Sequence, residues 1–313
     1  MNILLSTDNN YVMPTGVLMH SIGINNSDNV HYYILINESL TEDNKKSLKE
    51  IAYKYGNEID FYVVDEKLTE SLPFGRDEMP KHVSIATYYR LFITQILPED
   101  VHKIIYLDSD MIVRYSLNHL WNIDVSNCAI GVVHDEDEKN HIKTQRLSYP
   151  MEKGYFNAGM LLVNLDYWRE HDCLLRFVHY IRDSYDEIIM HDQDVLNAVL
   201  HDEKKWLPVT YNFQVGFLLE EKRCYIDEIY DEVGIAMQNP SIIHYCMNGK
   251  PWQLYFYVPY VKVWRYYKGK SEWKNIPLEG EHPDNLIHYL TAFWFKHCFN
   301  VRKTGRLKVI LRK

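Results

Sequence analysis

The first 110 residues alternate between short apolar runs and segments that can form helices, and this alternation limits the fold more than any other feature. Strands are predicted at 3–6, 30–36, 59–64 and 104–107. Helices are predicted between them at 11–24, 41–55 and 84–97. Strands that alternate with helices form a mostly parallel sheet covered by helices. We therefore expect a doubly wound, Rossmann-like α/β fold, with ligands at the carboxyl ends of the strands.

The second half of the chain is less regular. It offers apolar runs for strands at 129–133, 160–163 and 242–245. Asp166 is predicted to cap a helix through residue 181, and Asp192 is predicted to cap a helix that runs to residue 200. No internal repeat or low-complexity linker divides the chain. We expect one domain over residues 1–270 and a helical, basic tail over 271–313.

Charge is distributed unevenly along the chain. The net charge is −9, but residues 285–313 hold seven basic and no acidic side chains, so the remainder carries −16. An acidic body argues against nucleic-acid binding, which depends on many basic contacts to phosphates. The tail mixes basic with aromatic residues and predicts peripheral binding to an anionic membrane surface. The alternative is a terminal helix packed on the domain, with its cations in solvent or paired to the acidic body.

Three further features bear on where the chain works. No apolar stretch reaches the roughly 18 to 20 residues that cross a bilayer, and the N-terminus enters a predicted strand without a basic leader. Five cysteines, odd in number and without a CxxC pair, suit a reducing compartment. We expect a cytoplasmic protein, held at the inner face of the membrane if the tail binds lipid.

Asp108-Ser109-Asp110 places two carboxylates directly after the apolar strand at 104–107. Two oxygen ligands at this spacing suit a hard divalent cation such as Mg²⁺ or Mn²⁺, which can bridge to substrate phosphates. The alternative is a solvated turn in which an aspartate caps a helix. Taken alone, the motif leaves both interpretations open.

His244 lies in the strand predicted at 242–245, and Lys250 follows it by six residues. The imidazole can supply a nitrogen ligand that favours Mn²⁺, and the lysine can neutralise a phosphate oxygen. The alternative is a core histidine with satisfied hydrogen bonds, followed by a Gly-Lys-Pro turn.

Taken together, these segments and several others resemble glycosyltransferase family 8, the retaining sugar-nucleotide transferases that include bacterial lipopolysaccharide galactosyltransferases and glycogenin. The matching segments are Thr7 to Tyr11, Thr87 to Leu91, Tyr106 to Asp110, Phe156 to Gly159, Asp192 to Asp194 and His244 to Trp252. They occur in the family's order across residues 1–265, which makes the set far more specific than any single motif. The resemblance implies an A-type glycosyltransferase catalytic domain.

The resemblance also implies a role for each matched residue. The implied metal ligands, for Mn²⁺ or Mg²⁺, are Asp108, Asp110 and His244. The residues implied to bind a UDP-sugar donor are Asp8, Asn10, Arg90, Asp108, Asn157, Asp192 and Lys250. Of these, Asp8 and Asn10 would contact the uridine and Lys250 the diphosphate. Gln193 and Asp192 would lie beside the reacting carbon of the sugar.

Two positions stand apart from this pattern. Family members usually have glycine three residues after the histidine, whereas this chain has Met247 there and its glycine at Gly249. Asp135, in the acidic segment 134–138, resembles by position the loop that reaches the acceptor. The alternatives are a solvated charge run and, over residues 134–150, a lid on the bound donor.

The function implied is a retaining, Mn²⁺-dependent transfer of galactose or glucose from a UDP-sugar to a glycan or glycolipid acceptor. Gln193 is an amide and a poor nucleophile, which favours front-face substitution over a covalent intermediate on Asp192. Two other classes remain open at this point. One is a metal-dependent nucleotidyl- or phosphotransferase, which would need a phosphate loop that Thr7 to Tyr11 lacks. The other is a non-catalytic protein that binds sugar nucleotides on the same fold.

Overall fold

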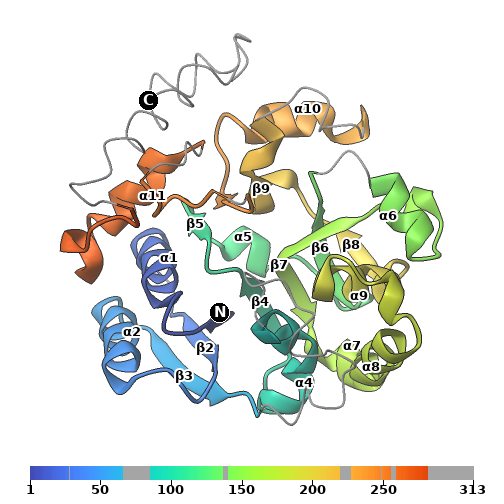
Figure 1. Ribbon diagram of the computed structural model, residues 1–313, viewed down its shortest axis with the longest axis horizontal. Coiled ribbons are helices and arrows are strands. Elements are labelled where there is room, and N and C mark those ends of the chain that lie inside the picture. The colour runs from blue at the N-terminus through green and yellow to red at the C-terminus, as the bar shows by residue number, and fades with distance from the viewer. Residues whose placement is uncertain are drawn as a thin grey trace.

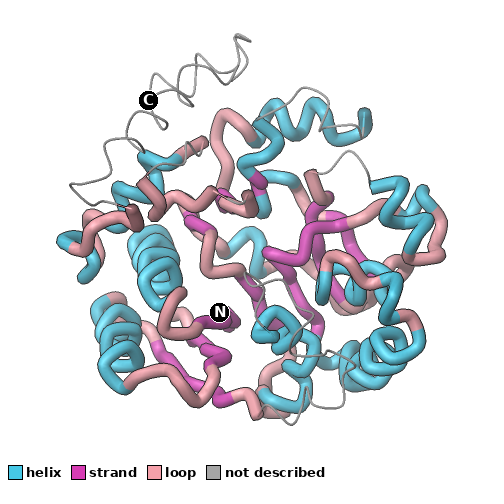
Figure 2. Tube along the Cα trace, viewed as in Figure 1, coloured by secondary structure: helices cyan, strands magenta, loops and turns pink. Residues whose placement is uncertain are grey.

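A computed structural model of the chain describes residues 1–27, 29–65, 85–136, 140–218, 227–247, 249–254 and 259–280. Within these residues a seven-stranded sheet lies at the centre, with helices around it and a three-stranded sheet beside it (Figures 1 and 2). The predicted tail from residue 281 onward lies outside the described residues. Among the residues that are described, no helix is both long enough and apolar enough to cross a membrane.

The large sheet has the order β3-β2-β1-β4-β7-β6-β8. Its strands are β1 (Asn2–Thr7), β2 (His31–Ile36), β3 (Glu58–Val63), β4 (Lys103–Leu107), β6 (Ile130–His134), β7 (Phe156–Asn164) and β8 (Lys204–Trp206). Only β7 runs antiparallel to its neighbours β4 and β6, and the other pairs are parallel. The expected mostly parallel α/β sheet is therefore confirmed.

Helices cover both faces of this sheet. The α-helices are α1 (Val12–Asn25), α2 (Glu42–Lys54), α4 (Ile93–Ile96), α5 (Asn118–Trp121), α6 (Asn140–Arg146), α7 (Leu165–Glu170), α8 (Cys173–Asp183), α9 (His191–Leu200), α10 (Asp227–Ala236) and α11 (Val261–Lys268). Short 3₁₀ helices are η1 (Ile85–Phe92), η2 (Met151–Lys153), η3 (Tyr185–Glu187), η4 (Val209–Asn212), η5 (Val215–Leu218) and η6 (Glu272–Asn275). In β1, Ile3 and Leu5 share a core with α1 and α2, whereas Leu4 shares one with α7, α8 and α9. Successive residues of a strand point to opposite faces, so a continuous apolar run serves both cores.

The elements of the first half match the sequence with small shifts. Thr41 caps α2, because its side chain accepts a hydrogen bond from the backbone N–H of Asn44. Gly56, with φ of +72°, follows the helix in the left-handed region that favours glycine. The helix predicted at 84–97 is instead the 3₁₀ helix η1 followed by the single turn of α4.

The predicted cap at Asp166 is wrong. Asn164, the last residue of β7, caps α7 because its side chain accepts from the backbone N–H of Tyr167. The helix expected through residue 181 is also interrupted, since Asp172 has φ of +48° between α7 and α8.

Asp192 is not the cap of α9 either. Met190 occupies the cap position, and Asp192 lies in the first turn with its side chain buried. The carboxylate faces Arg90 and Thr87. Asp192, a short polar residue ahead of an apolar segment, therefore makes a tertiary contact and does not occupy the cap position of the helix.

The small sheet was only partly predicted. It has the order β5-β10-β9, formed by β5 (Met111–Val113), β10 (Ile242–His244) and β9 (Phe213–Gln214). The run at 242–245 indicated β10, but two- and three-residue strands have no periodicity to detect.

Residues 271–280 pack against the first half of the chain. Nε2 of the buried His20 on α1 lies 2.5 Å from Glu272 of η6, and Trp273 occupies the space beside Gly16. The division of the chain at residue 270 stays a prediction.

Candidate active site

A pocket of about 330 Å³ opens at the carboxyl ends of β1 and β4. Connections leave these two neighbouring strands toward opposite sides of the sheet order, the position where ligands bind in open α/β sheets. Six residues expected from the sequence line it: Arg90, Asp108, Asp110, Asn157, Asp192 and Gln193.

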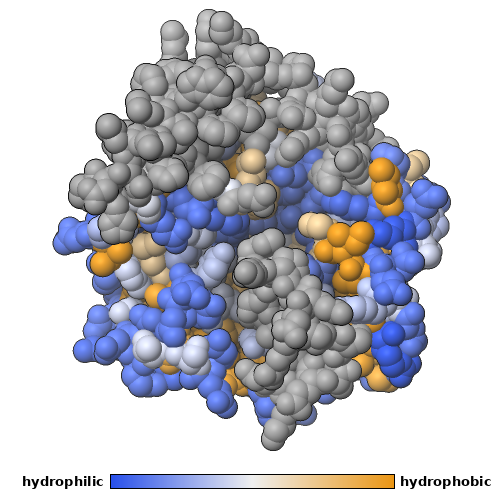
Figure 3. Space-filling model, in the orientation of Figure 1, coloured by the Kyte–Doolittle hydropathy of each residue, from blue (hydrophilic) through white to orange (hydrophobic). Residues whose placement is uncertain are grey.

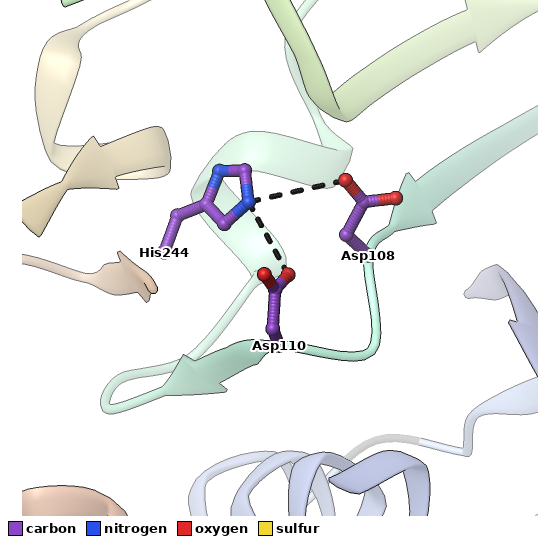
Figure 4. Close-up of side chains that lie close together, drawn as sticks. All are labelled: Asp108, Asp110 and His244. Carbon is purple, nitrogen blue, oxygen red and sulfur yellow. Dashed lines mark ion pairs between the residues drawn. The ribbon is translucent and has the colours of Figure 1, made fainter. Parts of the chain in front are cut away.

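Asp108, Asp110 and His244 form a group that could hold a metal ion, with one ligand atom from each lying within 4.8 Å of the others. His244 Nε2 lies 3.2 Å from Asp110 Oδ1 and 3.9 Å from Asp108 Oδ2 (Figure 4). The two aspartates flank the turn that joins β4 to β5, and β10 pairs with β5 so that His244 lies opposite Met111. Because β5 follows the turn, the alternative of an aspartate that caps a helix is wrong.

The donor set and the space behind it fit a divalent cation. Two carboxylate oxygens and one imidazole nitrogen suit Mn²⁺, and Mg²⁺ accepts the oxygens. Gly159 of β7 leaves this space open, since a Cβ atom there would lie 2.3 Å from His244 Cε1 and 2.9 Å from Asp108 Oδ2. Because Gly159 has no side chain, the three candidate ligands can lie close together and form a compact candidate metal-binding group.

Lys250 lies beside the metal-binding group. Its Nζ atom donates to Asp110 Oδ2 at 2.6 Å and to the backbone oxygen of Tyr245 at 2.9 Å. Burial alone would lower the pKa of Lys250, but Asp110 raises it above its ordinary value. Burial would likewise raise the pKa of Asp110, yet Lys250 and His244 hold it well below its ordinary value. Both groups therefore stay charged at neutral pH.

Arg90 connects Asp108 of the candidate metal-binding group with Asp192. Its guanidinium donates to Asp108 Oδ1 at 2.9 Å and lies 3.0 Å from Asp192 Oδ2. It also stacks over the ring of Tyr106, 4.1 Å from the ring centroid. Burial raises the pKa of Asp192 to about 6 against the lowering effect of Arg90. These contacts hold the buried guanidinium in place.

Gln193 lines one wall of the pocket and contacts Asp135. Gln193 Oε1 accepts from the backbone N–H of Ala158 at 2.9 Å, and its Nε2 donates to Asp135 Oδ2 at 3.2 Å. Asn157 Nδ2 donates to the same carboxylate at 3.3 Å, and Lys143 lies 2.9 Å from its Oδ1. Asp135 is thus buried and paired, so the interpretation of a solvated charge run is wrong at this residue.

Asp8 and Asn10 lie in the turn between β1 and α1. Asp8 Oδ1 accepts from the backbone N–H groups of Asn10 and Tyr11, both at 2.9 Å, which fixes the turn at the start of α1. Tyr11 lines the pocket, and its ring meets that of Trp252 edge-on at 5.8 Å. The roles of Asp8 and Asn10 toward a uridine stay predictions.

Several residues of the site carry no signal that sequence reasoning detected. Tyr155 lies 3.2 Å from Gln193 Nε2. Asn212 contacts His244, and Lys143 pairs with Asp135. Isolated polar residues such as these are ordinary in a sequence, and only the fold brings them to the pocket.

Apolar side chains collect beside the Gln193 wall. Ile142 of α6 and the two residues before α9, Ile189 and Met190, have exposed fractions of 50%, 61% and 44%. Figure 3 shows apolar side chains over α6 and the start of α9, next to hydrophilic surface. Met190 also lines the pocket. We call these three residues the apolar rim, and Met190 is the member that brings an apolar side chain into the pocket beside its charged residues.

The sheet order and the site together define the A-type glycosyltransferase fold. Residues 2–254 match the model of Glycosyl transferase family 8, and the chain belongs to this family. It is 28% identical to general stress protein A of Bacillus subtilis over 88% of this chain and 96% of that protein. It is 24% identical to a lipopolysaccharide 1,3-galactosyltransferase of Salmonella typhimurium over 96% of this chain and 86% of that protein.

Solved structures agree with this assignment. The crystal structure of galactosyltransferase LgtC with donor and acceptor sugar analogs matches with a TM-score of 0.76 at 26% identity. The match covers 87% of this chain and 96% of that chain. The resemblance expected from the sequence motifs is therefore confirmed.

Proposed function

We propose that this family 8 glycosyltransferase is a retaining, Mn²⁺-dependent enzyme that transfers galactose or glucose from a UDP-sugar to a saccharide or lipid-linked saccharide. The observation that carries the proposal is the group of Asp108, Asp110 and His244, whose two aspartates line the same pocket as Arg90 and Gln193. Carboxylates alone would suit many cations, but an imidazole beside them favours Mn²⁺ over Mg²⁺.

Positive charge at this end of the pocket would stabilise the UDP leaving group. A bound Mn²⁺ would supply a Lewis acid for the diphosphate. Lys250, whose Nζ lies 2.6 Å from Asp110 Oδ2, would add a second positive charge to the leaving phosphate. Arg90 would bind the donor through the part of its guanidinium not occupied by Asp108 and Asp192.

The groups nearest the sugar side support retention by front-face substitution. Gln193 is a neutral amide whose oxygen already accepts from Ala158, so it can stabilise positive charge but is a poor nucleophile. Asp192 is held by Arg90 and Thr87 at 3.0 and 2.8 Å, which suits the binding of sugar hydroxyls better than attack on carbon. The departing phosphate oxygen would then take the proton of the acceptor hydroxyl.

The acceptor would approach along the wall formed by Gln193 and Asp135. Asp135 would orient an acceptor hydroxyl through its carboxylate, which already lies within hydrogen-bond distance of Gln193 and Asn157. The apolar rim at Ile142, Ile189 and Met190 would suit an acceptor with an apolar part next to its sugar. A lipopolysaccharide transferase among the similar proteins supports a glycan acceptor of this kind.

Release of UDP from UDP-galactose and UDP-glucose, with Mn²⁺ and with excess chelator, tests the proposal. We expect activity only with the metal, and a loss of at least about 100-fold in Asp110→Asn or His244→Ala, by analogy with removing one electrostatic stabiliser. Asp202→Asn, which alters an exposed ion pair with Lys153, is the matched control and should remain active. Full activity in chelator would contradict the metal requirement.

The other two classes give different results in the same assay. A non-catalytic sugar-nucleotide binder would release no UDP even with acceptor, and a nucleotidyltransferase would release pyrophosphate or a nucleoside monophosphate. Proton NMR of the anomeric signal then tests retention. An α-linked product from an α-donor is expected, and a β-linked product would rule out front-face substitution.

A further inference from the structure

Asn212 lies behind the candidate metal ligands, at the end of η4, with its side chain fully buried. Its Oδ1 atom lies 3.0 Å from Nδ1 of His244, the ring nitrogen that does not face Asp110. Its Nδ2 atom lies 2.9 Å from Oδ1 of Asn157. Asn212 therefore connects a candidate metal ligand with a candidate donor-binding residue.

Two groups of fixed polarity determine which way the amide of Asn157 faces. The backbone N–H of Gly159 can only donate, and it lies 3.0 Å from one amide atom of Asn157, which must be the oxygen. The other amide atom lies 3.3 Å from a carboxylate oxygen of Asp135, an acceptor, and must be the nitrogen. Both contacts require the same orientation, so the assignment does not depend on a choice between two equivalent flips.

The orientation of Asn157 fixes that of Asn212 and then the protonation of His244. The Asn157 oxygen needs a donor, so Asn212 presents its nitrogen there and its oxygen to the imidazole. An amide oxygen 3.0 Å from Nδ1 requires a proton on Nδ1. In the neutral ring the lone pair is then on Nε2, which lies 3.2 Å from Asp110 and 3.9 Å from Asp108.

We propose that Asn212 is a positioning residue that holds His244 in the Nδ1–H tautomer and so presents the Nε2 lone pair to a divalent cation. The inference rests on the proposed metal-dependent function. Histidines that bind metals usually donate their second N–H to a protein acceptor, which fixes the tautomer and the ring orientation. Here the acceptor is the side-chain amide of Asn212. The backbone N–H of Gly159 sets the orientation of Asn157, and Asn157 in turn sets the orientation of Asn212.

Nitrogen NMR of the full-length, metal-free protein with ¹⁵N-labelled histidine reads the tautomer without any metal or substrate. Spectra are recorded at pH 8.5, and the His244 signals are identified by their loss in His244→Ala. We expect Nδ1–H in the wild type. In Asn212→Leu we expect an Nε2–H population, because Asp110 is then the remaining acceptor. An Nε2–H wild type, or an unchanged tautomer in Asn212→Leu, would overturn the proposal.

Mn²⁺ affinity, measured by electron paramagnetic resonance of the free ion, is the second readout. Asn212→Leu should weaken binding about 10- to 100-fold, because the imidazole loses the acceptor for its Nδ1–H. Asn26→Leu is the matched control, because Asn26 is also buried and also makes two hydrogen bonds, to Ile22 and Leu117. Equal losses in Asn212→Leu and the control would contradict a specific role.

The two readouts separate this inference from the proposed function. If the wild type binds no Mn²⁺, the metal-dependent function fails, and the tautomer measurement still decides what Asn212 does. If the wild type binds Mn²⁺ and Asn212→Leu binds it equally well, the function stands and the positioning role is wrong.

Discussion

Gly159 illustrates how a single residue without a side chain can set the geometry of a site. An added Cβ atom would lie 2.3 Å from His244 Cε1, closer than non-bonded atoms approach, and 2.9 Å from Asp108 Oδ2. Two candidate metal ligands would have to move. We therefore expect Gly159→Ala to weaken Mn²⁺ binding and to lower UDP release by at least about tenfold, the scale of a disturbed ligand shell.

Gly131→Ala is the control for this variant. Gly131 also lies in a strand of the large sheet, but its added Cβ atom would meet the end of the Leu207 side chain at 2.9 Å. Both variants crowd the sheet, so similar unfolding midpoints with unequal Mn²⁺ affinities are the expected outcome. Equal loss of affinity in both would mean that Gly159 acts only through stability.

His134 predicts a pH dependence of stability. Burial, with a contribution from Lys204, lowers the pKa of His134 to about 4, and its ring stacks on Trp206 with 3.5 Å between centroids. The unfolded chain takes up this proton near pH 6.5 and the folded chain does so only near pH 4. The stabilisation is therefore complete above pH 6.5 and is lost as the pH falls toward 4.

Urea unfolding at pH 7.5 and pH 5 measures this effect. Between these values the wild type should lose about 2 kcal/mol more unfolding free energy than His134→Phe, which keeps an aromatic ring against Trp206 but cannot titrate. The same loss in both proteins would show that other groups account for the acid sensitivity.

At the scale of elements, Asp194 on α9 holds together three segments that surround the Gln193 wall. Its buried carboxylate accepts from Arg146 of α6, from the Tyr155 hydroxyl and from the backbone N–H groups of Ile189 and Met190. Those donors would lose their common partner in Asp194→Ala. Asp194 therefore holds the backbone just before α9, where two residues of the apolar rim lie.

Asp194→Ala should lower the free energy of unfolding by about 3 to 5 kcal/mol, as breaking a buried ion pair does. Asp202→Ala, just beyond the other end of α9, removes an exposed pair with Lys153 and should cost much less. Chemical denaturation of the two variants beside the wild type measures the difference. Similar losses would show that the Asp194 cluster contributes no more than a surface ion pair.

At the scale of the whole molecule, charge divides the chain into an acidic body and a basic tail. Residues 285–313 lie outside the described residues, so their membrane role stays a prediction. Seven cations at about 1 kcal/mol each near an anionic surface would hold the protein there at low salt. We expect the full chain to sediment with anionic vesicles but not neutral ones.

A chain that ends at Asn300 is the comparison for this experiment. It should stay in the supernatant with anionic vesicles, and added salt should release the full chain because the attraction is screened. If the shortened chain binds equally well, or the full chain does not bind at low salt, residues 301–313 are not the anchor.

The sequence by itself determined the class of fold and most of the chemistry of the site. Apolar strand runs separated by helices require a sheet covered on both faces, and they gave β1 to β4 almost to the residue. The ordered motifs indicated family 8, and they named six of the residues that line the pocket. Patterns of this kind can be detected in a sequence because each of them lies within a single strand, helix or turn.

Only the tertiary structure decided which side chains act together. Asp192 looked like a helix cap and instead binds Arg90, while Asp135 looked solvated and instead is buried against Lys143. Asn212 had no pattern at all, yet it contacts His244, 32 residues away along the chain. Each of these roles depends on a partner that is distant in sequence, and a hydrogen bond between distant residues leaves no periodicity in either segment.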